Sequence, residues 1–85
     1  MNQELYDRAT ALLNSIERTK TITKHLEDAV NSTCQTISNR YFPYNAPNED
    51  GFDEVFPELR TKLLQEIEKK MSAEISRLKT QFENL

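Results

Sequence analysis

Small and apolar side chains recur along the first half of the chain at alternating steps of four and three residues. This spacing is the a and d pattern of a heptad repeat, and it predicts one long helix with a seam that faces another helix. The stretch contains no glycine or proline, so nothing in it should interrupt a helix about 50 Å long. The predicted seam comprises Leu5, Ala9, Leu12, Ile16, Thr19, Thr23, Leu26, Val30, Thr33 and Ile37.

The middle of this seam, "ERTKTITK", is its weakest part. Thr19 and Thr23 offer less apolar surface than leucine would, and Ile22 is the only strong hydrophobe nearby. Three interpretations stay open: a weakened or kinked section, a place where the partner changes, or an ordinary solvated stretch of a long helix.

A second apolar repeat fills the last third of the chain. Pro43 disfavours helical geometry at Phe42, and we expect Asp53 to be the N-cap of the next helix, with Pro57 at its fourth position. Glu58 with Lys62, and Glu66 with Lys70, are i,i+4 pairs that mark a solvated face. We therefore predict a first helix over about 3–41, a loop over about 42–52 and a second helix over about 53–85, in a single domain over 1–85. The apolar positions of the second helix are Phe56, Leu59, Leu63, Leu64, Ile67, Met71, Ile75, Leu78, Phe82 and Leu85.

These elements predict an all-α fold, an antiparallel hairpin of two long helices with coiled-coil-like seams. The chain has 85 residues, of which 36% are hydrophobic and 29% charged, and a single cysteine excludes an internal disulfide. A domain of this size buries only about 60% of its unfolded surface, and small cores usually need disulfides, metals or oligomerisation. We therefore expect the hairpin to complete a helical bundle with a partner.

Charge and hydropathy narrow the classes of partner. A net charge of −3 with interspersed signs gives no basic face for direct nucleic acid binding. No apolar run approaches the roughly 18–20 residues of a membrane span, and the N-terminus "MNQELYDRAT" lacks the apolar core of a secretory signal. Together with one unpaired cysteine, this predicts an intracellular protein that does not insert into a membrane.

Few residues could carry chemistry. His25 is expected on the solvent side of the first helix, and Cys34 lies on its apolar side, where a thiol acts as a small hydrophobe. A chain with one glycine has no Gly-rich phosphate loop, and no cluster has metal-ligand spacing. We therefore predict no catalytic, cofactor-binding or metal-binding residue. An enzyme or small-molecule binder would need a pocket between helices lined by Cys34 or His25.

The interruption "RYFPYNAPNEDGF" is unusually aromatic for a loop. We expect Phe42 and Phe56 to pack against each other across the turn, fully buried, and Tyr44 to lie partly exposed. The alternative is an exposed aromatic patch that anchors a partner, because Tyr and Phe are enriched at interface hot spots.

From His25 to Leu85 the sequence resembles the helical head of the polyamine-modulated-factor family. The resemblance rests on a helix that ends in Phe42-Pro43, on a second helix that reads "LLQEIEKKMSAEI" and on the closing "FENL". That family is a subunit of the four-protein kinetochore assembly MIND. The resemblance implies a hairpin that pairs with a sister subunit's hairpin in a four-helix head and links centromeric chromatin to microtubule-binding proteins, in the nucleus.

Our leading hypothesis is a non-catalytic helical scaffold subunit of a multiprotein complex, which the resemblance would place at the kinetochore. The alternative is a cytoplasmic coiled-coil subunit or adaptor of a membrane-trafficking or tethering complex. The expected partner is another helical subunit in a hetero-oligomer, with a homodimer as the second arrangement. The predicted partner-binding residues are Leu12, Ile16, Leu26, Val30, Ile37, Tyr44, Ile67, Met71, Leu78 and Phe82.

Overall fold

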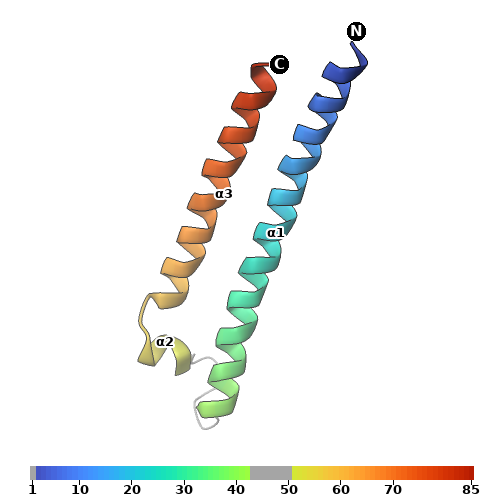
Figure 1. The fold of residues 1–85 in the computed structure, drawn as a ribbon. Coiled ribbons are helices and arrows are strands. Elements are labelled where there is room, and N and C mark those ends of the chain that lie inside the picture. The colour runs from blue at the N-terminus through green and yellow to red at the C-terminus, as the bar shows by residue number, and fades with distance from the viewer. Residues whose placement is uncertain (1, 43–50) are drawn as a thin grey trace.

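The computed structural model describes residues 2–42 and 51–85. In these ranges the chain forms α1 (Gln3–Tyr41), α2 (Gly51–Val55) and α3 (Leu59–Glu83). The long helices α1 and α3 run antiparallel and side by side, so the two termini lie at the same end (Figure 1). The molecule measures 64 × 17 × 15 Å with a radius of gyration of 18.9 Å, against about 12 Å for a compact domain of this length. The prediction of an all-α helical hairpin is confirmed.

The first helix has the bounds that the heptad pattern predicts. Asn2 is its N-cap, and its side chain accepts a hydrogen bond from the Glu4 N–H at 2.9 Å, which satisfies one of the free donors of the first turn. The threonine-rich middle is continuous helix. Thr19 and Thr23 donate their hydroxyls to the carbonyls of Ser15 and Thr19, each at 2.8 Å, so Thr23 is buried with its polar atom satisfied.

The start of the second long helix differs from the prediction. Asp53 is not an N-cap, because it lies inside the short helix α2, and α3 begins six residues later at Leu59. Pro57 explains the break, since it lacks an N–H and disfavours helical geometry at the residue before it. Glu58 then adopts a left-handed conformation with φ 67° and turns the chain into α3. The helix ends at Glu83 rather than at residue 85.

The inner face of α1 departs from a strict heptad in the second half of the helix. Leu26 is 49% exposed and Thr33 is exposed, whereas Glu27 is half-buried and Cys34 is buried. A straight α-helix drifts about 20° per heptad relative to a 3.5-residue repeat, so over several heptads the contact stripe moves to the next position. In the isolated hairpin Leu26 and Thr33 therefore lie beside the inner face of α1 rather than within it.

The turn region is held by Phe52 rather than by a pair of Phe42 and Phe56. The Phe52 side chain is buried, and its N–H donates to the Ser38 hydroxyl at 3.0 Å, which joins the start of α2 to the end of α1. Phe42 packs on Gly51, where any side chain would collide with its ring. Phe56 faces Phe52, with ring centroids 5.3 Å apart, and remains 49% exposed. The expectation that Phe42 and Phe56 form a fully buried pair is therefore wrong. Tyr44 lies outside the described residues.

Candidate interaction surface

One side of the hairpin carries an apolar groove between α1 and α3. Its first section, of about 320 Å³, lies midway along the hairpin, and a second section of about 270 Å³ leads towards α2. Leu26 lines both sections, so the two form one continuous depression. We refer to it as the apolar groove, and its apolar lining comprises Ile22, Leu26, Ala29, Val30, Cys34, Phe52, Leu63, Ile67 and Met71.

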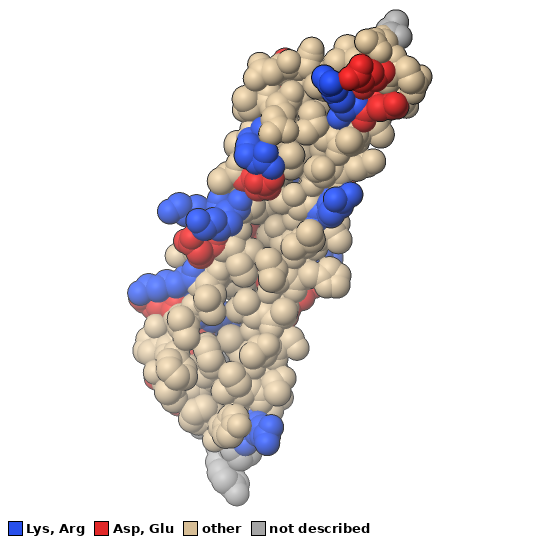
Figure 2. All heavy atoms as spheres, in the orientation of Figure 1, with Lys and Arg blue, Asp and Glu red and all other residues tan. Residues whose placement is uncertain are grey.

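Several of these side chains face solvent although they are strongly apolar. Ile22 is 52% exposed and Leu63 is 42% exposed. A lone exposed hydrophobe needs no explanation, but a contiguous apolar surface with polar margins marks an interaction site. On one face of the molecule, uncharged side chains cover much of the surface over both long helices, while charged ones gather along the outer edge of α3 and near the start of α1 (Figure 2).

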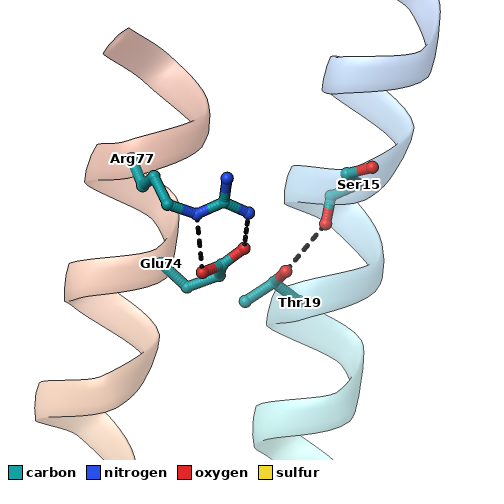
Figure 3. Close-up of polar contacts among 4 residues, drawn as sticks. All are labelled: Ser15, Thr19, Glu74 and Arg77. Atoms are coloured by element: carbon teal, nitrogen blue, oxygen red, sulfur yellow. Dashed lines mark hydrogen bonds and ion pairs between the residues drawn. The ribbon is translucent and has the colours of Figure 1, made fainter. Parts of the chain in front are cut away.

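The margin of the groove on α3 is charged. Glu66, Lys70 and Glu74 line the first section, and Lys70 pairs with Glu66 at 3.8 Å. Arg77 binds Glu74 with two hydrogen bonds, and both side chains extend from α3 towards Thr19 on α1 (Figure 3). This pairing lowers the pKa of the Glu74 carboxyl below its ordinary value, chiefly through the hydrogen bonds and then through the charge of Arg77. The groove therefore has an apolar floor and a margin of alternating charge.

A second depression between the long helices, of about 330 Å³, includes carboxyl side chains from both helices. It is lined by Glu27 of α1 and, on α3, by Thr61, Leu64, Gln65 and Glu68. We call it the acidic flank. A hydrogen bond with Glu68 raises the pKa of the Glu27 carboxyl above its ordinary value, and burial and the negative charges of Glu68 and Asp28 add to the effect. The two carboxyl groups repel each other when both are ionised.

The predicted partner-binding residues fall into different environments. Ile16 and Leu78 are buried inside the hairpin, so they hold the chain's own helices together. Leu26, Val30, Ile67 and Met71 line the apolar groove. Phe82, which is 39% exposed, belongs to neither group. The half-buried members are Leu12, Val30, Ile37, Ile67 and Met71, and Tyr44 lies outside the described residues.

Sequence reasoning missed Ile22, Ala29 and Leu63 as lining of the surface. Ile22 was noted only as the strong hydrophobe of the weak seam, and Leu63 only as one of the apolar positions of the second helix. The available signal was the weak seam itself, because a strong hydrophobe next to a threonine at a contact position indicates a second apolar face on the same helix.

The side chains considered for chemistry lie apart from one another. His25 is exposed on α1, beside Lys20, Lys24 and Asp28, whereas Cys34 is 3% exposed at the base of the groove. Within residues 2–42 and 51–85, no group of three or more His, Cys, Asp or Glu side chains is arranged to hold a metal ion. No helix of the same ranges is long and apolar enough to cross a membrane.

Comparison with protein-family models, with curated proteins and with solved structures finds no match to this chain.

Proposed function

We propose that this protein is a non-catalytic helical scaffold subunit that joins a multiprotein complex through its apolar groove. The groove itself carries the proposal. Two antiparallel helices with an apolar depression between them offer the site into which the apolar face of another helix packs. The charged margin on α3 would fix the register of that helix, because charged residues beside an apolar seam set partner choice and orientation.

The thinness of the hairpin supports the same proposal. With extents of 17 and 15 Å across the helices, no described large side chain reaches less than 2% exposure. The burial that stabilises a domain of this length is therefore incomplete within the chain, and packing a further helix onto the groove would add to it.

The specific complex follows from the resemblance to the polyamine-modulated-factor family alone. On that basis we propose the kinetochore, with the hairpin as part of a head that links centromeric chromatin to microtubule-binding proteins. The alternative is a subunit or adaptor of a membrane-trafficking complex, which would need the same groove.

Affinity capture of the tagged full chain from its own cells tests these proposals. Leu63→Asp places a charge in the groove, and Gln65→Asp places the same charge on the acidic flank as the matched control. We expect a helical partner to co-purify with the wild type and the control but not with Leu63→Asp, while circular dichroism shows equal helix content. A partner retained by Leu63→Asp would contradict the proposed surface. Centromere proteins among the captured partners support the kinetochore, and vesicle or lysosome proteins support the alternative.

A further inference from the structure

We propose that the apolar groove binds a second copy of this chain in a two-fold, antiparallel arrangement that forms a four-helix bundle. This inference rests on the proposed function in one respect, namely that the groove is the surface of assembly. It goes further by specifying the occupant, the direction in which the helices run and the charged pairs that join the two copies.

The order of charges along the groove margin carries the inference. From the start of α3 towards its end, the charged residues on this side are Glu66, Lys70, Glu74 and Arg77. Their signs alternate, beginning negative and ending positive. The same series read backwards has the opposite sign at every position. An antiparallel α3 of a second copy therefore meets opposite charges throughout, with Lys70 opposite Glu74 and Glu66 opposite Arg77, whereas a parallel α3 in register would meet like charges.

The spacing of these residues agrees with one symmetry axis. The steps of four, four and three residues keep the series on one face of the helix. The pairing of Lys70 with Glu74 and that of Glu66 with Arg77 are both centred at about position 72, near the middle of α3 (Leu59–Glu83). A single two-fold axis at that point therefore satisfies both pairings and their symmetry mates, as a closed isologous dimer requires.

Apolar side chains lie where the axis crosses the groove. Met71 of α3 and Ile22 of α1 line the same section as Lys70 and Glu74, and Ile22 is half exposed in the isolated chain. In the proposed arrangement α3 lies on α3 of the second copy and α1 on its α1. These side chains are then enclosed at the centre, and the charged pairs remain at the edge. This is the apolar core and polar rim of a protein interface.

Sedimentation velocity over a concentration series tests the inference, with Lys70→Glu and Glu74→Lys as variants. Each variant alone turns both Lys70–Glu74 contacts of the dimer into repulsions, and we expect its dimer dissociation constant to rise about tenfold or more. In an equimolar mixture the two variants face each other with opposite charges, so we expect the mixture to recover dimer. The matched control is Lys69→Glu, which changes the neighbouring exposed lysine outside the groove lining.

A wild type that stays monomeric at all concentrations would overturn the inference. So would a mixture that fails to recover dimer, or a Lys69→Glu control that weakens association as much as Lys70→Glu does. Circular dichroism of each variant separates lost association from lost helix. A monomeric chain that still captures a different helical protein through the groove would refute the second copy as occupant and leave the proposed function standing.

Discussion

The apolar groove and the acidic flank are built by the same two helices, yet different side chains line them. In the groove, Ile22 and Leu63 project apolar side chains that are about half exposed. On the flank, the neighbouring Glu68 carboxyl raises the pKa of Glu27. A surface that stays in water tolerates carboxyl groups, whereas apolar side chains gain free energy only when something covers them.

On the proposal that the groove binds a partner, this contrast gives the hairpin a direction of assembly. Under that proposal the acidic flank faces solvent and the groove faces the partner. The seam, the groove and the flank should then contribute separately to stability and to association.

The largest effect is expected for Phe52→Ala, which tests the seam at the end of the groove. Phe52 is buried beside the Ser38 bond and also lines the groove. Its truncation should lower the free energy of unfolding by about 3–5 kcal/mol, measured by urea denaturation followed by circular dichroism. Phe56→Ala is the control and should cost clearly less, because that ring is half exposed. Equal losses of stability would show that Phe56 holds the turn as strongly as Phe52 does.

Gly51→Ala should follow, since it decides how closely α2 approaches α1. A methyl group at this position collides with the Phe42 ring, and overpacking of this kind costs about 1–3 kcal/mol. The double variant with Phe42→Ala should lose less stability than the sum of the single changes. Strict additivity in thermal melts would show that Gly51 and Phe42 do not meet.

Glu58→Gly should stabilise the turn into α3 without touching either flank. Glu58 has a left-handed backbone, which costs a non-glycine residue about 1 kcal/mol and glycine almost nothing. Its ion pair with Lys62, at 3.8 Å, is exposed and contributes little. We expect a higher melting temperature with unchanged self-association. A change in association would show that the turn and the groove are coupled.

The smallest effects should distinguish the two flanks by pH. Glu27 has a raised pKa in the folded chain, so its contribution to stability is present in acid and is lost as the pH rises through the folded pKa. Glu74 on the groove margin has a lowered pKa, so its contribution is present at neutral pH and is lost as the pH falls through the folded pKa.

Glu27→Gln should therefore raise the melting temperature at about pH 7, and Glu74→Gln should lower it, with both differences shrinking towards about pH 4. Thermal melts of the two variants beside the wild type across this range provide the measurement. Differences of the same sign for both variants would mean that the two flanks are electrostatically alike.

The sequence was sufficient for the hairpin and for the bounds of α1, because the spacing of apolar residues in a helix is set by its own geometry. It was insufficient at Pro57, where a proline near the expected start of a helix was compatible both with a first-turn position and with a break. The left-handed backbone of Glu58 shows that the helix breaks at this point. Glutamate has no special preference for that conformation, so the residue type gave no sign of the break.

The interaction surface was only partly predictable. Leu26, Val30, Ile67 and Met71 were identified from the heptad and do line the groove. Ile16 and Leu78 were identified by the same pattern but are buried within the chain. A straight helix drifts relative to the heptad repeat over several heptads. This drift determines which seam residues face the other helix of the hairpin and which face outward, and the periodicity of the sequence alone does not predict it.

Thiol footprinting tests the central claim most directly, because it compares the two flanks in one chain under the same conditions. Leu63→Cys places a thiol in the groove and Gln65→Cys places one on the acidic flank, whereas the native Cys34 is buried at the base of the groove. As the protein concentration rises and the chain assembles, alkylation at position 63 should slow while alkylation at position 65 stays constant. Protection at position 65 without protection at position 63 would contradict the account, as would equal protection of both.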